Sequence, residues 1–244
     1  QQLIENEEYV DAQKLALKDI IGDINITSHG QKYESVGNLV LSFPDHEKYK
    51  NLYRELDLNT AIATTKYSLN GVEYKRETFT SYTDQLIIIR LTASDKGKIT
   101  FSTSFVSPLK ENMVTAESFI PEGSKNTLVV ISTCAREKEE NIPNLLNAYT
   151  LIKVVPQGGT QTSTDNSISI TNADEAIIYI STATNFVNYK DISGNAEQRA
   201  KDYLNRFSKN YETAKADHTA FYQKQFNRVS LNLGLTSKEQ LAKP

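Results

Sequence analysis

Between residues 191 and 202, oxygen-bearing side chains recur at intervals that could bind a cation. Asp191, Ser193 and Asn195 occupy alternate positions and Asp202 stands twelfth, as in the loop that holds calcium between two helices. The glycine, however, stands fourth instead of sixth, and Asp202 is shorter than the usual glutamate. A turn leading into a capped helix requires the same residue types. We therefore predict a helix cap and no bound metal, with a calcium site formed by these four residues as the alternative.

Histidine and cysteine offer little for metal or nucleophilic chemistry. His29, His46 and His218 are far apart in the sequence and lack metal-ligand spacing. Cys134 is the only cysteine, which excludes an intrachain disulfide, and its strand-like surroundings favour an unreactive thiol. His218 falls on an apolar helical stripe, so we predict a packed, hydrogen-bonded histidine. No nucleophile elbow, phosphate loop or dinucleotide motif occurs, and we predict no catalytic residue and no cofactor in this chain.

Carbohydrate chemistry is the remaining class to consider. Two facing carboxylates can hydrolyse a glycosidic bond, but the sequence does not show which of its 30 acidic residues converge. Sugar-binding surfaces favour flat aromatic platforms, and the chain has 13 tyrosines but no tryptophan. Tyr67, Tyr74 and Tyr82 lie in strand-like segments, so we interpret them as cross-strand packing pairs. This interpretation weakens a role in sugar binding without excluding it.

The bulk composition narrows the class of protein. The 244 residues include 27 Lys and Arg against 30 Asp and Glu, and the mean hydropathy is −0.47. A mildly acidic chain without a basic cluster gives no reason to expect nucleic acid binding. No apolar run reaches the ~18 residues that a membrane span needs. We expect a domain with a substantial core that neither crosses a membrane nor binds nucleic acid.

The periodicity of apolar residues predicts mainly strands after a short helix over Glu5–Gly22. Thr60–Tyr82 is the clearest hairpin, because Asn70-Gly71 favours a two-residue turn that pairs Tyr67 with Tyr74. We predict about ten strands in all, with residues 158–166 as a hairpin loop. The other predicted strands are Val36–Phe43, Gln85–Ala93, Lys98–Phe105, Thr127–Thr133, Ala148–Val155, Ser167–Thr171 and Ala176–Thr182.

Three of these strands are continuously apolar, which indicates that both of their faces are covered. Short polar turns without interleaved helices favour antiparallel pairing. We therefore predict an all-β fold, a large two-sheet antiparallel β-sandwich over residues 1–190, with an N-terminal helix. Residues 191–244 are predicted to form a helical linker.

The predicted linker contains two amphipathic helices, Asn195–Leu204 and Phe207–Phe226. Their apolar stripe includes Phe207, Tyr211 and Phe221 at three- and four-residue steps. The sandwich can cover part of this stripe and a following domain can cover the rest. We predict that these three residues contact such a domain.

Several segments, in order along nearly the whole chain, resemble the N-terminal β-domain of glycoside hydrolase family 95, the inverting α-L-fucosidases. Glu8-Tyr9 and Ala12 through Gly22 resemble the segment that precedes the family's first long loop. The other segments are Tyr53–Ala63 (YRELDLNTAIA), Tyr74–Phe79 (YKRETF), Ser81–Leu91 (SYTDQLIIIRL), Ala183–Phe186 (ATNF) and Gln225–Gly234 (QFNRVSLNLG).

The resemblance implies a large sandwich and helical linker followed by an (α/α)₆ barrel that carries the catalytic groups. None of the family's catalytic positions map onto this chain. The expected function is a non-catalytic N-terminal domain of an inverting α-L-fucosidase that acts on terminal α-linked fucose or related galactose of glycans. Its partners would be the catalytic domain of the same parent and the glycan substrate. The parent would be periplasmic or secreted. A free-standing carbohydrate-binding module and a structural interaction domain remain alternatives.

Overall fold

The computed structural model describes residues 2–19, 35–106, 114–134, 145–232, 234, 236 and 240. Helix α1 (Gln2–Glu5) and helix α2 (Tyr9–Asp19) come first, and neither contains a buried residue. The helix predicted over Glu5–Gly22 is therefore present as α2, and Gly22 lies outside the described residues. No helix in the described part of the chain is both long and apolar enough to span a membrane.

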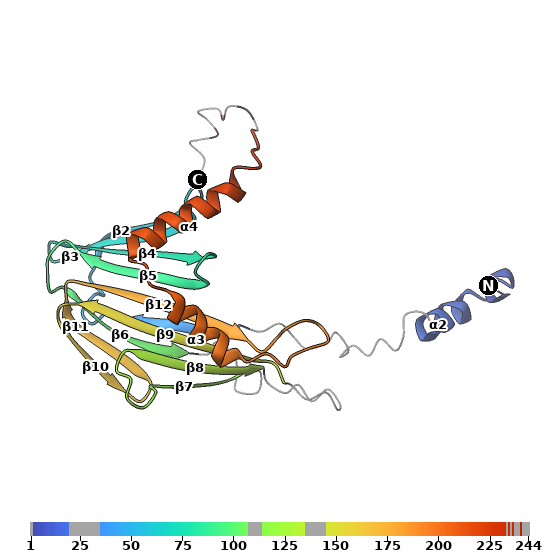
Figure 1. Cartoon of the computed structure of the whole chain (residues 1–244). Coiled ribbons are helices and arrows are strands. Elements are labelled where there is room, and N and C mark those ends of the chain that lie inside the picture. Colours follow the sequence, from blue (N-terminus) through green and yellow to red (C-terminus); the bar gives the residue numbers. More distant parts are fainter. Residues whose placement is uncertain are drawn as a thin grey trace.

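The described strands form two antiparallel sheets (Figure 1). The eight-stranded sheet has the order β2-β3-β4-β5-β12-β9-β8-β7, and the four-stranded sheet has the order β1-β6-β11-β10. The all-β sandwich predicted from the sequence is confirmed. In chain order the strands are β1 Asn38–Ser42, β2 Lys50–Asp57, β3 Ile62–Leu69, β4 Val72–Ser81, β5 Leu86–Ala93, β6 Ile99–Val106, β7 Val114–Phe119, β8 Thr127–Cys134, β9 Asn147–Gln157, β10 Thr160–Thr164, β11 Ser167–Ala173 and β12 Glu175–Thr184.

The hairpin of β3 and β4 has the predicted register. Tyr67 lies opposite Tyr74, and Leu69 lies opposite Val72 across the turn. Asn70 and Gly71 both adopt positive φ, 51° and 83°, as a two-residue hairpin turn requires. The turn therefore fixes which side chains face each other along both strands.

The main core lies between the two sheets. Strands β6 and β11 contribute Phe101 and Ile168, and the facing strands of the large sheet contribute Leu128, Val154 and Ile178. All five side chains are almost fully buried. The predicted coverage of both faces is clearest in β9, where five consecutive residues are buried.

Two helices cover the opposite face of the large sheet (Figure 1). Helix α3 (Ala196–Arg206) lies on β12 and β9, and Ser181 of β12 donates a hydrogen bond to the carbonyl of Ala200 at 2.8 Å. Helix α4 (Tyr211–Phe226) lies on β4. We call this face of the eight-stranded sheet the helix-side face.

Two local predictions need correction. The second helix begins at Tyr211 and not at Phe207, because Asn210 caps it with a hydrogen bond from the Thr213 amide. Residues 158–166 are not only a loop, since β10 pairs with β11 along Thr160–Thr164. Its polar composition reflects its place at a sheet edge, where most of its side chains are exposed. The predicted division into 1–190 and 191–244 stays a prediction.

Candidate functional site: the helix-side face of the large sheet

An apolar cluster attaches α4 to the helix-side face. Phe79 of β4 and Ile88 of β5 pack against Tyr211 and Ala214 of the helix. The Phe79 ring lies 5.8 Å from the Tyr211 ring and 4.8 Å from the imidazole of His218. Phe79 is only 2% exposed, so the start of α4 is held by the burial of large side chains.

His218 belongs to this contact. Its Nε2 donates a hydrogen bond to the carbonyl of Thr60 at 3.0 Å, and the side chain is buried. The predicted packed, hydrogen-bonded histidine is confirmed. His29 lies outside the described residues, and Cys134 is the last residue of β8.

His46 is also packed, on the other side of the sheet. Its Nδ1 lies 2.7 Å from the hydroxyl of Tyr67, and its ring meets that of Tyr74 edge-on at 4.6 Å. Burial lowers the pKa of His46, although Glu47 and Asp45 act to raise it. Burial also raises the pKa of Tyr67 to about 12, so neither group is charged at neutral pH.

Ion pairs connect α4 and the residues before it to the sheet. The carboxylate of Glu77 lies 2.8 Å from the ammonium of Lys215 and 2.9 Å from that of Lys75. Asp84 lies 2.9 Å from Lys209, just before the helix. The carboxylates of Glu77 and Asp84 are largely buried, and each has a cation within ion-pair distance, as buried charges require.

Arg90 makes the third charged contact. Its guanidinium lies 2.7 Å from Glu175 of the neighbouring strand and 2.6 Å from Glu212 of α4. It also lies 4.7 Å from the centre of the Tyr211 ring. One arginine thus connects two strands and the helix.

The environment of Glu77 does not suit acid catalysis. Burial acts to raise the pKa of Glu77, but hydrogen bonds from Lys215 and Lys75 outweigh it, and the pKa lies below its usual value. A glycosidase acid needs the opposite shift, towards a protonated carboxyl at neutral pH. All described carboxylates with a shifted pKa have it lowered, namely Asp57, Glu77, Asp84 and Asp191.

The residues predicted to contact another domain all touch the sandwich. Phe207 packs on Tyr179 at 5.0 Å, and Phe221 stacks on Tyr82 at 4.6 Å. Both keep partial exposure, whereas Tyr211 is buried in the cluster under α4. The sandwich therefore covers more of this stripe than its spacing alone indicates. Contact of Phe207, Tyr211 and Phe221 with another domain stays a prediction.

The predicted cap before α3 is confirmed. Asn195 accepts a hydrogen bond from the Gln198 amide at 2.9 Å, and Asp191 accepts one from the Ser193 amide at 2.8 Å. Asp202 accepts from the side chain of Gln198. The turn, the cap and a side-chain contact within α3 therefore occupy oxygens of Asp191, Asn195 and Asp202, respectively. Among the residues that the structure describes, no group of three or more His, Cys, Asp or Glu is arranged to hold a metal ion.

The same loop presents apolar side chains that sequence reasoning did not single out. Phe186 and Tyr189 are exposed, yet the backbone beside them is firmly held. The side-chain amide of Asn185, which is buried, donates to the carbonyl of Leu145 at 2.8 Å. Arg199 of α3 donates to the carbonyl of Phe186 at 2.7 Å. An apolar surface on a fixed loop is a feature of contact sites.

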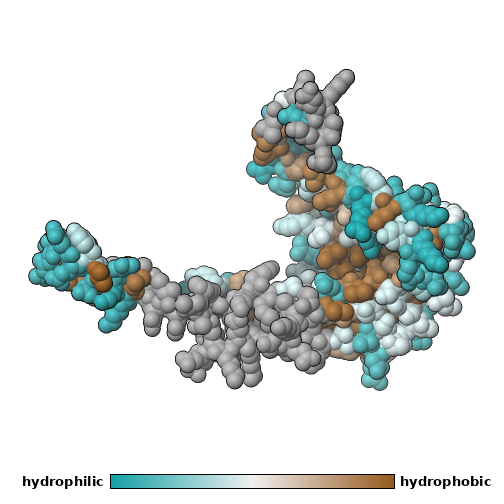
Figure 2. Space-filling view, turned by 180° about the vertical axis from the view of Figure 1, so that it is seen from behind, coloured by the Kyte–Doolittle hydropathy of each residue, from teal (hydrophilic) through white to brown (hydrophobic). Residues whose placement is uncertain are grey.

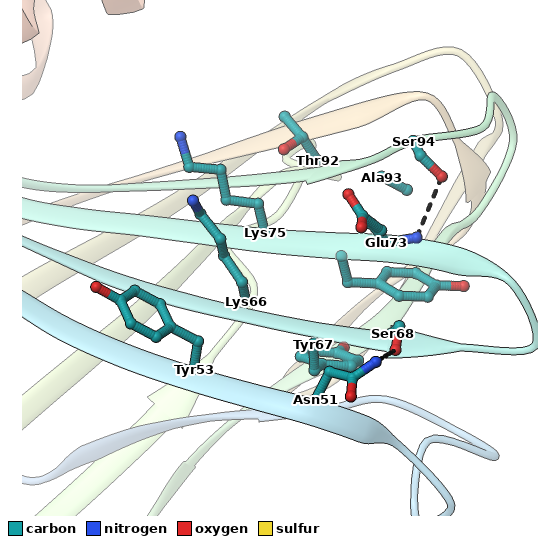
Figure 3. Close-up of a pocket in the computed structure, with 11 residues that line it drawn as sticks. Asn51, Tyr53, Lys66, Tyr67, Ser68, Glu73, Lys75, Thr92, Ala93 and Ser94 are labelled. Atoms are coloured by element: carbon teal, nitrogen blue, oxygen red, sulfur yellow. Dashed lines mark hydrogen bonds between the residues drawn. The ribbon is translucent and has the colours of Figure 1, made fainter.

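A second, polar site occupies the part of the helix-side face that α4 leaves open. Strands β2 to β5 form the floor of a groove of about 510 Å³ (Figure 3). Its lining includes Tyr53, Lys66, Glu73 and Lys75, of which Glu73 is the one carboxylate. The Asn70-Gly71 turn already places Lys66 opposite Lys75, but the position of β2 beside them was not predicted.

Comparisons with known proteins find matches along most of this chain. The family described as "Glycosyl hydrolase family 65, N-terminal domain" matches residues 1–189. "Alpha-L-fucosidase 2" of Arabidopsis thaliana is 33% identical over 226 residues, which cover 85% of this chain and 27% of that protein. "Probable alpha-fucosidase A" of Aspergillus niger is 23% identical over 218 residues, covering 82% of this chain and 26% of the relative.

A solved structure of a "Putative kojibiose phosphorylase from human microbiome" covers 76% of this chain and 27% of its own, with 10% identity and a TM-score of 0.45. The chain spans about a quarter of the length of the curated relatives it matches. The family model carries the number 65 whereas the sequence resemblance was to family 95, and both describe the N-terminal domain of a glycoside hydrolase. The chain belongs to the glycosyl hydrolase N-terminal domain family, as the resemblance predicted.

Proposed function

We propose that this domain is the non-catalytic N-terminal part of an α-L-fucosidase-type glycoside hydrolase and supports the catalytic domain that follows it. The observation that carries the proposal is the attachment of α4, which the Phe79 cluster and ion pairs to Glu77 and Arg90 hold on the sheet. A helix attached in this way gives the following chain a fixed starting point.

The chain after α4 exposes apolar side chains that could pack against another domain. Phe226 is exposed at the end of the helix, and Val229 and Leu231 beyond it are 83% and 81% exposed. Figure 2 shows hydrophobic side chains near this end of the molecule and over the middle of the sandwich. The curated relatives are almost four times as long as the matched region, which supports the remainder of a longer parent chain as the proposed occupant of this surface.

The lowered pKa values of Asp57, Glu77, Asp84 and Asp191 support a non-catalytic role, because they keep these four carboxylates ionised at neutral pH. Glu77 and Asp84 are also held in ion pairs. The fucosidase relatives favour terminal α-linked fucose, or related galactose, as the sugar released by the parent. We expect the catalytic groups in the following domain, and the parent in the periplasm or outside the cell.

An assay of fucose release tests separately whether the parent is a fucosidase and whether this domain is non-catalytic. The 244-residue chain and the longer parent polypeptide are each incubated with an oligosaccharide that ends in α-linked fucose. We expect release by the parent only. Release by residues 1–244 alone would overturn the non-catalytic role.

The contact surface is tested in the same two proteins. Val229→Asp with Leu231→Asp places two charges in the proposed contact, so the parent is expected to unfold at a lower temperature. The isolated chain, in which both residues are exposed, is expected to keep its melting temperature. Equal effects in both proteins would contradict the contact.

A further inference from the structure

The open groove contains a pairing that is unfavourable for the fold. One row of side chains crosses four strands, because Tyr53 lies opposite Lys66, Lys66 opposite Lys75, and Lys75 opposite Thr92. All four point to the helix-side face, and Figure 3 shows the two lysine side chains projecting to the same side. Like charges directly opposite each other in a sheet are destabilising.

The surrounding protein compensates only one of these two charges. Lys75 pairs with Glu77 at 2.9 Å. Lys66 has no carboxylate within ion-pair distance among the described residues, and its ammonium lies 5.9 Å from the centre of the Tyr53 ring. A solvated surface lysine explains Lys66 alone, but it does not explain its position beside a second lysine in a groove. An anion bound between the two ammonium groups would remove the repulsion.

A neighbouring row offers groups suited to hydroxyls. Asn51 donates a side-chain hydrogen bond to Ser68 at 2.9 Å, and Ser94 accepts one from the Glu73 amide at 3.1 Å. The bond to Asn51 leaves the Ser68 oxygen able to accept another, and the Glu73 side chain is exposed. Donors and acceptors therefore line the groove beside the lysines.

Tyr53 supplies a flat apolar surface at one side of the groove. Its ring is 49% exposed, and a hydrogen bond to Glu55 is one cause that raises the pKa of its hydroxyl. An exposed ring of known orientation beside polar groups matches the way proteins bind sugar rings.

We propose that this groove binds an acidic sugar, with the sugar ring on Tyr53 and its carboxylate or sulfate between Lys66 and Lys75. The proposal rests on the proposed function only for the choice of a sugar as carrier of the anion. It gives the domain a glycan contact of its own, separate from the bond that the parent cleaves.

Calorimetry with the 244-residue chain tests the proposal at low and at physiological salt. The ligands are an oligogalacturonate, a sulfated oligosaccharide of similar length, a neutral fucosylated oligosaccharide and inorganic sulfate. We expect at least one acidic oligosaccharide to bind about tenfold more tightly than the neutral one, with weaker binding at the higher salt. The oligogalacturonate and the sulfated ligand distinguish carboxylate from sulfate as the bound group.

Lys66→Ala and Tyr53→Ala are each expected to weaken this binding about fivefold or more. The matched controls are Lys190→Ala and Tyr189→Ala, because Lys190 lies 5.2 Å from the Tyr189 ring in an exposed pair outside the groove. The controls are expected to bind as the unmodified chain does. Circular dichroism checks that all four variants remain folded.

Three results would overturn the proposal. The first is that the neutral and the acidic oligosaccharides bind with equal affinity. The second is that inorganic sulfate alone binds as tightly as the acidic oligosaccharides. The third is that Lys66→Ala binds the acidic oligosaccharide with unchanged affinity. None of them bears on fucose release by the parent. The acidic-sugar site and the fucosidase assignment can therefore fail separately.

Discussion

The two halves of the helix-side face treat charge differently, although the same strands build both. Under α4, Glu77 and Arg90 each meet an opposite charge on the helix. In the open half, Lys66 faces another lysine and lacks an anion among the described residues. Where the helix excludes water, an unpaired charge costs several kcal/mol, whereas water screens it in the open groove. The comparison teaches that charges are paired where the domain must hold its helix and left available where a ligand can enter.

Removing the apolar contact under α4 has the largest expected effect. Phe79→Ala leaves a cavity beneath Tyr211 and His218, so we expect the free energy of unfolding to fall by about 3–5 kcal/mol. Urea unfolding monitored by circular dichroism measures the change. Tyr53→Ala in the open half is the control, with less than about 1 kcal/mol expected because the ring is half exposed. Similar losses at both positions would remove the distinction between the halves.

Glu77 lies at the border of the two halves, and its removal affects them in opposite directions. Glu77→Gln leaves Lys215 without its charged partner and is expected to cost about 1.5–3 kcal/mol of stability. It also frees Lys75 from its ion pair, so binding of an acidic oligosaccharide in the groove is expected to become about twofold tighter. Denaturant unfolding and calorimetry on the same protein measure the two effects.

Glu73→Gln is the matched control, since Glu73 is on the same strand and face but exposed. We expect little change in its stability. Acid adds an independent check, because the pKa of Glu77 lies below its ordinary value of 4.5 in the folded protein. The stabilisation by ionised Glu77 is complete above pH 4.5 and is lost as the pH falls through the folded-state pKa. Glu77→Gln is therefore expected to show a weaker loss of stability over this part of the acid unfolding curve.

Local patterns allowed much of the fold to be predicted. For each strand predicted outside the hairpin, both ends lie within two residues of the ends of the corresponding observed strand. The Asn70-Gly71 turn determined the hairpin register, because its geometry permits only one alignment of the flanking residues. Strand β2 was missed because nearly all its side chains are exposed, which removes the apolar alternation that marks a strand.

The contacts of the candidate sites could not be predicted in the same way. Arg90 meets Glu175 because β5 lies beside β12, two strands far apart in the sequence. The groove requires β2 beside β3, and its open half exists only because α4 ends over the other half. Sheet order and helix placement depend on the packing of the whole domain, whereas a turn or a cap depends on a few neighbouring residues.

The two helix caps provide a smaller test of the comparison. Asn210 begins α4 and Asn195 begins α3, each accepting a hydrogen bond from an amide three residues ahead. Substitution of either by Ala is expected to cost about 1 kcal/mol in thermal or urea unfolding. In Asn210→Ala, the Phe79 cluster and the ion pairs still hold the start of α4, so the transition is expected to remain a single step. An early separate transition of α4 would show that the cap, and not the sheet contact, positions the helix.

His46 gives the smallest expected effect and tests the face that carries no helix. Because burial lowers its pKa below 6.5 in the folded state, the unfolded chain binds more protons between the two pKa values. The contribution of His46 to the free energy of unfolding is therefore complete above about pH 6.5, and it declines as the pH falls below that value. His46→Gln keeps a polar group near the Tyr67 hydroxyl without titrating, so its stability is expected to vary less between pH 7 and about pH 5. An equal slope in both proteins would mean that His46 is protonated in the folded state as readily as in the unfolded chain.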